Sequence, residues 1–302
     1  MKVRELFVRK RRPQDPAESW EMPYSEQDGG FYFRGNYAGH PCVPRNLEQM
    51  PVGAFDSLEG PCGVEELRQI LIIPSSVRAT GLGNQKVITP LQVLAVGARA
   101  VGLWAAKPEP GTKVIVTLKD LAAIEDVQIL LYGRLSFLAR DQRLTIRYNT
   151  VCRRVLEPPL HTLRRRIAAP GCAPPQPSGK APPLPFKWNF LLAWPFSTLD
   201  PNAPRDFQFL CEPRRKRGWI ERGHMLVLTP WELVSMRDPP ESDHSYGVDS
   251  FFMARSRIQA VAPGQKGVEI TVNGARFVLS LAPPLLAAVA AWFATAPEAA
   301  SA

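Results

Sequence analysis

The pattern of apolar and polar positions along the chain occurs twice. The first copy runs from about Val93 to Leu163 and the second from about Met225 to Val289. Each copy has a strand-like apolar run, a second run ending in an apolar-x-x-apolar step, two runs separated by a turn, and a helical stretch. Because the elements follow in the same order, the chain is predicted to build one architecture twice.

The spacing of matching positions supports the repeat. Leu94 and Leu121 are 27 residues apart (121 − 94), and the matching Leu226 and Ile258 are 32 apart (258 − 226). The extra length lies in the polar, proline-containing segment 238–247, where a longer loop costs little closure entropy.

The turn between the last two runs differs between the copies. In the second copy, Asn273-Gly274 predicts a two-residue turn with positive φ at both central positions. In the first copy, residues 140–142 occupy the same point and predict a looser turn. Before the first copy, Leu67 to Ile73 predicts a strand or a short helix that runs into one.

Each copy ends in a predicted helix that begins at a Pro-Pro pair, Pro158-Pro159 or Pro283-Pro284. In the first helix the apolar residues recur on one side, and Arg164, Arg165 and Arg166 lie mostly on the other. The second helix has almost no polar face. It is therefore predicted to bury several sides and to contact the other module or another chain, through the residues Leu286, Ala290 and Phe293.

Several motifs resemble the pleckstrin-homology (PH) family. In the second copy, Trp219-Ile220 is followed by HMLVLTPWEL over 224–233 and MARSRIQAV over 253–261, and Trp292 lies deep in the last helix. The first copy is similar to bacterial PH-like domains through VGARAVGLW over 96–104 and TLKDLAAI over 117–124, although it lacks the helix tryptophan. The resemblance covers about two thirds of the chain. It implies a mainly β (α+β) fold with two PH-like antiparallel β-barrels or sandwiches, each closed by a C-terminal helix.

Composition changes along the chain predict the domain boundaries. The segment before the first module lacks a period, and a proline-rich stretch between the modules is typical of a semi-rigid linker. The predicted parts are an irregular extension over 1–62, a first PH-like domain over 63–168, a linker over 169–185, a second PH-like domain over 186–297 and a tail over 298–302.

Length and composition are those of a globular protein. The chain has 302 residues, 45% of them hydrophobic and 22% charged. No apolar run reaches the ~18 residues that a membrane-spanning helix requires, and the N-terminus has no continuous apolar core of the kind found in signal peptides. The cytoplasm is the expected location, with peripheral attachment to a membrane as the alternative.

The cysteines do not predict a metal site. Five cysteines are scattered without a C-x-x-C pair, and the four histidines do not cluster with them. Zinc sites require closely spaced ligand pairs, so reduced, mostly buried thiols are expected, with no metal and no cofactor.

Basic residues indicate candidate anion sites. Nine arginines lie between Val127 and Ala168 against two acidic residues, and the chain has a formal net charge of +9. They form either a surface for acidic partners or a solvated helix face. In lipid-binding PH domains a basic loop after the first strand contacts inositol phosphates. If Phe207–Cys211 is that strand, the resemblance places Arg214, Arg215, Lys216 and Arg217 in the loop.

No catalytic motif is present in the sequence. Glu65-Glu66 and Glu125-Asp126 have no partner motif, and no serine lies in a G-x-S-x-G turn. The leading hypothesis is a non-enzymatic protein that mediates protein–protein interaction or self-association. The alternatives are recruitment to anionic membrane lipid or phosphate through the basic loops, and nucleic-acid binding, for which aromatic residues between the basic runs are lacking.

Overall fold

The computed structural model describes residues 36–37, 41–80, 84–106, 112–129, 132–168, 206–211, 215–216, 219–220, 223–229, 231–239, 247–264 and 267–279. The first half of the molecule is taken as 36–168 and the second as 206–279. The mainly β class predicted from the sequence is confirmed.

The first half begins with short elements and a four-stranded sheet. The 3-10 helix η2 (Leu47–Gln49), the helix α1 (Ala54–Cys62) and the 3-10 helix η3 (Leu67–Gln69) precede the strands. The first sheet has the order β2-β5-β6-β7, all antiparallel, with β2 (Ile70–Ile73), β5 (Gln92–Val96), β6 (Ala100–Ala105) and β7 (Thr112–Thr117). A separate small sheet contains β1 (Asn36–Tyr37), β3 (Ser76–Thr80) and β4 (Asn84–Thr89).

Three further strands and a helix complete the first half. They are β8 (Leu121–Ile129), β9 (Tyr132–Ala139) and β10 (Arg143–Asn149), followed by η4 (Thr150–Cys152) and α2 (Arg153–Ile167). The second half follows the same order of strand pairing. Its four-stranded run is β11 (Asp206–Cys211), β14 (His224–Leu228), β15 (Glu232–Arg237) and β16 (Val248–Ala254), with the hairpin β12 (Arg215–Lys216) and β13 (Trp219–Ile220) after β11. After η5 (Arg255–Arg257), the outer sheet is formed by β17 (Ile258–Gly264), β18 (Gly267–Val272) and β19 (Ala275–Leu279).

One sheet joins the two halves. β16 of the second half pairs antiparallel with β8 of the first, from Val248 opposite Gln128 to Phe252 opposite Ile124. The result is a seven-stranded central sheet of order β10-β9-β8-β16-β15-β14-β11. Instead of forming two closed barrels, the described sheets remain open, and the two halves share a sheet.

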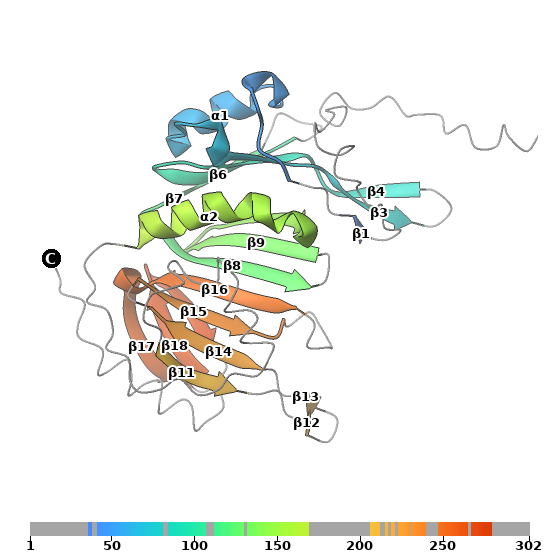
Figure 1. Ribbon diagram of the computed structural model, residues 1–302. Coiled ribbons are helices and arrows are strands. Elements are labelled where there is room, and N and C mark those ends of the chain that lie inside the picture. The colour runs from blue at the N-terminus through green and yellow to red at the C-terminus, as the bar shows by residue number, and fades with distance from the viewer. Residues whose placement is uncertain are drawn as a thin grey trace, which may run out of the picture.

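The molecule is built in layers (Figure 1). α1 covers the outside of the first sheet, and α2 lies between the first sheet and the central sheet. One apolar core joins residues of the first sheet and α2 to one face of the central sheet in both halves, including Leu94, Leu163, Val234 and Phe252. The outer sheet packs on the opposite face of the central sheet through a second core.

The strands β2, β5 and β6 of the first sheet are buried on both faces. Leu71 and Leu94 face the shared core, and Ile70 and Val93 face a third core beneath α1. This explains the unbroken apolar runs of β2 and β5, which lack a polar side. Gly102 on β6 allows α1 to approach closely, because a Cβ there would lie 2.4 Å from the sulfur of Cys62.

Two helical segments differ from their predicted positions. α2 begins at Arg153, so Pro158 and Pro159 lie inside it rather than at its start. Asn149 supports the earlier start by accepting a hydrogen bond from the N–H of Val151 (3.0 Å) just before the helix. The predicted irregular extension contains α1, whose Ala54, Leu58 and Cys62 are buried. With only nine residues, this helix has too few apolar positions for a helical period to stand out among the surrounding polar residues.

Several local predictions are confirmed. Asn273 and Gly274 have positive φ values of 47° and 73° and connect β18 to β19. Leu67 to Ile73 is a 3-10 turn that runs into β2. The predicted helix after Pro283-Pro284 and the linker lie outside the described residues. In the part of the chain that the structure describes, none of the helices is both long and apolar enough to cross a bilayer.

Candidate functional site at the junction of the two halves

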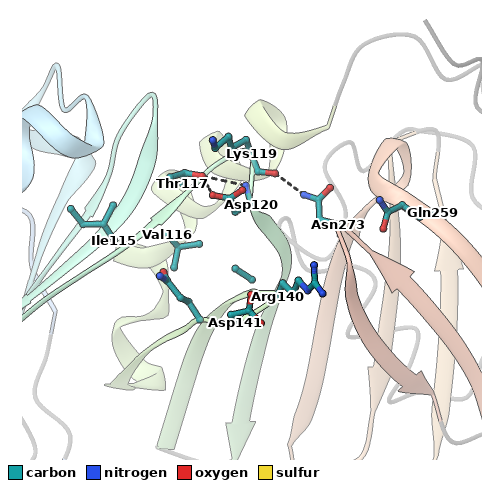
Figure 2. A pocket seen from close by; sticks show the side chains of 11 residues that line it. Ile115, Val116, Thr117, Lys119, Asp120, Arg140, Asp141, Gln259 and Asn273 are labelled. Atoms are coloured by element: carbon teal, nitrogen blue, oxygen red, sulfur yellow. Dashed lines mark hydrogen bonds between the residues drawn. The ribbon is translucent and has the colours of Figure 1, made fainter.

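A cleft lies where the two halves meet, and its volume is about 510 Å³. Figure 2 shows its residues. The first half contributes residues 115–117 at the end of β7, Lys119 and Asp120 of the β7–β8 turn, and residues 139–142 of the β9–β10 turn. The second half contributes Gln259 of β17 and Asn273 of the β18–β19 turn. The cleft is therefore assembled from turns that are distant in the sequence.

Local hydrogen bonds fix the β7–β8 turn above the cleft. The hydroxyl of Thr117 donates to the carboxylate of Asp120, and the N–H of Asp120 donates to the carbonyl of Thr117 (3.1 Å) and more weakly to its hydroxyl oxygen (3.3 Å). This turn is short and polar: the hydroxyl of Thr117 binds the carboxylate of Asp120, and the backbone N–H of Asp120 closes the turn onto Thr117. Asp120 thus shapes the turn.

Side chains of the second half hold the same turn from the other side. The amide of Asn273 donates to the carbonyls of Lys119 (2.8 Å) and Leu121 (3.1 Å). The guanidinium of Arg257 donates to the carbonyl of Leu121 (2.8 Å) and to that of Leu118. Burial lowers the pKa of Arg257, an effect that the nearby Asp120 carboxylate opposes. These hydrogen bonds connect the second half directly to the β7–β8 turn of the first half, on the two sides of the cleft.

Besides Asp120, three charged side chains at the cleft are exposed to solvent, namely Lys119, Arg140 and Asp141. Within the described chain, none of the three makes an ion pair or a side-chain hydrogen bond. In Figure 2, Arg140 rises from the β9–β10 turn into the gap between the halves, below Asn273. These groups are free to meet a ligand, because their charges are not neutralised internally.

The candidate anion residue Arg164 is buried rather than on the outer face of α2. Its side chain is 3% exposed, and its Nε donates to Glu232 Oε2 at 3.0 Å while a second nitrogen binds Oε1. The guanidinium also lies 3.9 Å from the ring centroid of Phe252. This pair connects α2 to β15 and so to the second half. Helical spacing could not reveal it, because the partner lies 68 residues away.

A second buried polar cluster lies between α2 and the central sheet. Asp126 accepts hydrogen bonds from the hydroxyl of Tyr148 (2.6 Å) and the amide of Gln128 (2.6 Å), and Arg153 lies 3.5 Å away. Burial is the main cause that raises the pKa of Tyr148 well above its usual value, and it also raises the pKa of Glu157 beside Arg153. Asp126 is 1% exposed. The cluster therefore stabilises the packing and is closed to solvent.

Internal pairing removes part of the basic surface that the sequence indicated. Of the nine arginines, four pair with acids: Arg134 and Arg143 with Glu125, Arg153 with Asp126, and Arg164 with Glu232. The other five form no ion pair with an acid in the described ranges, and these are Arg140, Arg147, Arg154, Arg165 and Arg166. Arg154, Arg165 and Arg166 are exposed on α2, so the prediction of an anion surface stays open for Arg165 and Arg166.

The other candidate site residues are only partly placed. β11 covers the predicted strand 207–211, and Arg215 and Lys216 form β12 of the hairpin after it. Arg214 and Arg217 lie outside the described residues, as do Leu286, Ala290 and Phe293. Of the described residues in this set, neither Arg215 nor Lys216 lines the cleft.

The structure describes the surroundings of three thiols. Cys42 and Cys62 are buried and Cys152 is half-buried. Burial raises the pKa of Cys42 to about 12 and that of Cys62 to about 11. Across the ranges that the structure covers, no group of three or more His, Cys, Asp or Glu side chains is arranged to hold a metal ion.

The sequence contained no local signal for the cleft. Residues 140–142 predict only a turn, and Lys119 and Asp120 occur only within the TLKDLAAI motif of the PH-like resemblance. Their common location depends on the β8–β16 pairing, which places the turns of the two halves side by side. Comparisons with protein-family models, with curated proteins and with solved structures find no match to this chain.

Proposed function

We propose that this chain is a non-enzymatic protein-binding module built from two PH-like units, and that the cleft between the halves is its binding site. The observation that carries the proposal is a polar cleft assembled from turns of both halves and bordered by three charged side chains that have no ion-pair partner in the described part of the chain. The repeated order of strand pairing, four strands and then three, supports the two PH-like units.

The character of the cleft favours a protein partner over a small molecule. Small-molecule sites are mostly apolar and enclose most of their ligand, whereas this cleft is open and has exposed charged and amide groups along its rim. Protein interfaces have such polar rims, where charged groups contribute to specificity and to the rate of association. The buried titratable groups lie elsewhere: Asp126 and Glu232 are each held by internal donors.

Site-specific photo-crosslinking tests the proposal. A benzophenone amino acid is placed at Gln142 in the cleft and, as a matched control, at the exposed Asp56 of α1. We expect a discrete adduct from Gln142 that Arg140→Glu abolishes and Arg154→Glu retains. An adduct of twice the chain mass identifies self-association, and another mass identifies a different protein. The same adducts from both positions, or none from Gln142, would contradict the proposal.

A second candidate function is recruitment to an anionic membrane surface. Arg154, Arg165 and Arg166 are exposed on α2 without ion-pair partners in the described chain, and each basic residue near such a surface contributes about 1 kcal/mol. Co-sedimentation with anionic and neutral vesicles compares the intact protein with two variants. One carries Glu at Arg154, Arg165 and Arg166, and the other carries Glu at residues 214–217. Binding to anionic vesicles that either variant abolishes supports recruitment, and equal binding by all three proteins excludes these surfaces.

A further inference from the structure

The strand β7 has a free edge beside the cleft. Among the described strands, it is the last one of the first sheet and pairs only with β6. The N–H of Leu118 donates to the carbonyl of Arg99 (2.8 Å) where the two strands end. Because hydrogen-bonded pairs alternate along an antiparallel ladder, Val116 and Val114 bond to β6, while the N–H and C=O groups of Lys113, Ile115 and Thr117 point away from it.

These outward groups are available for pairing. In the described chain, the backbone of Ile115 and the N–H of Thr117 have no hydrogen-bond partner, and the carbonyl of Thr117 accepts only from Asp120. Ile115, Val116 and Thr117 line the cleft, so the free edge forms one of its walls. A row of unpaired strand groups is a template for another strand.

Two other strand edges are less suited to this role. Cys42 already bonds to the edge of β2, where its N–H donates to Ile72 (2.9 Å) and its carbonyl accepts from Ile72 (2.8 Å). β17 contains Pro263 and a shift of register after Ile258, both of which disfavour strand addition. The β7 edge has backbone N–H and C=O groups without hydrogen-bond partners in the described chain, and it lies beside a cleft that can receive side chains of an added strand.

The unpaired charges near this edge are mainly positive. Lys113 is exposed on β7 itself, and Lys119 and Arg140 lie at the cleft, together with the carboxylate of Asp141, which has no ion-pair partner in the described chain. The carboxylate of Asp120 already accepts from Thr117 and lies near the Arg257 guanidinium. Complementary charge therefore requires a partner with acidic side chains.

We propose that the cleft takes an extended acidic segment of a partner protein, which adds as a strand to the free edge of β7 and places a carboxylate against Arg140. This inference rests on the proposed protein-binding function. Main-chain hydrogen bonds to Ile115 supply affinity in this mode of recognition, and side-chain pockets supply specificity.

Selection from a phage library of linear 12-residue peptides on the immobilised full-length protein tests the partner class. We expect enrichment of peptides with acidic residues at alternating positions and with β-branched residues between them. Binding of the synthetic peptide is expected to weaken about tenfold in Arg140→Glu and to be unchanged in the matched control Arg154→Glu, which makes the same charge change on α2. No enrichment, enrichment of basic peptides, or equal weakening in both variants would overturn the proposal.

N-methylated peptides test strand addition itself. Two versions of the selected peptide are made, with N-methyl groups at odd or at even positions, because only alternate N–H groups of an added strand face β7. One version is expected to lose at least tenfold in affinity and the other to retain it, and equal affinities exclude strand addition. If crosslinking at Gln142 yields an Arg140-dependent adduct while these tests fail, the protein-binding function remains and the acidic strand is rejected. If both fail, both proposals are rejected.

Discussion

At the residue scale, the buried ion pair between Arg164 and Glu232 joins the two halves. The substitution Arg164→Met removes the guanidinium and leaves the Glu232 carboxylate buried without this ion pair. Breaking a buried pair in this way typically lowers the free energy of unfolding by about 3–5 kcal/mol. In urea unfolding, the free energy of unfolding of Arg164→Met is expected to be lower than that of the wild type by about this amount. Glu232 is buried at 2% exposure, so little water can replace the lost partner.

Two variants serve as controls for this prediction. Arg164→Met combined with Glu232→Leu removes both charges and is expected to regain most of the lost stability, because hydrophobic replacement of a whole buried pair is often neutral or stabilising. Arg165→Met, one position along the helix and exposed, is expected to change the free energy of unfolding by less than about 0.5 kcal/mol. Equal losses in Arg164→Met and Arg165→Met would show that the pair does not join the halves as described.

The buried thiols predict a pH dependence in the alkaline range. The pKa of Cys62 is raised to about 11 by burial, so the folded state holds this proton more tightly than the unfolded chain. The resulting stability is complete below the unfolded pKa of about 8.5 and is lost as the pH rises toward the folded pKa. The difference in the free energy of unfolding between the wild type and Cys62→Ala should therefore narrow between pH 8 and pH 10.5. A constant difference would contradict the role of the thiol proton.

At the element scale, the free edge of β7 predicts alternating amide protection. Val114 and Val116 donate their N–H groups to β6, whereas Ile115 and Thr117 point toward solvent and the cleft. In hydrogen exchange followed by NMR, the amides of Val114 and Val116 are expected to exchange at least tenfold more slowly than that of Ile115, since local opening is required only for the bonded groups. Uniform slow exchange along β7 would mean that the edge is already covered.

Elements were predictable where a period or a turn signal is local. The Asn273-Gly274 turn and the strand 207–211 follow from residue chemistry that needs no distant partner. The start of α2 was missed because Pro158-Pro159 is a strong local signal for a helix beginning, while the helix is supported from Arg153 onward by contacts with two sheets. The first residue of α2 is thus set by tertiary packing and not by the local preference of proline for a helix start.

At the scale of the whole molecule, pairing across the halves was invisible in the sequence. β8 and β16 are separated by more than a hundred residues, and neither carries a signal that selects the other. The sequence predicts a repeat, and the positions that its spacing pairs lie on strands of the same rank in each half: Leu94 on β5 with Leu226 on β14, and Leu121 on β8 with Ile258 on β17. The cleft could not follow from the repeat, because it depends on how one half docks on the other.

The shared sheet and core predict that the halves stay associated without a covalent connection. A protease recognition sequence inserted between residues 172 and 181 allows the chain to be cut in the native state. Because the β8–β16 ladder, the shared apolar core and the Arg164–Glu232 pair all join the halves, the two fragments are expected to elute together in gel filtration. Urea at a concentration above the unfolding midpoint should separate them. The Arg164→Met variant should release its fragments at lower urea, since it lacks one of these joining contacts. Fragments that separate in buffer alone would mean that the halves are independent domains, and the cleft between them would then not be a fixed site.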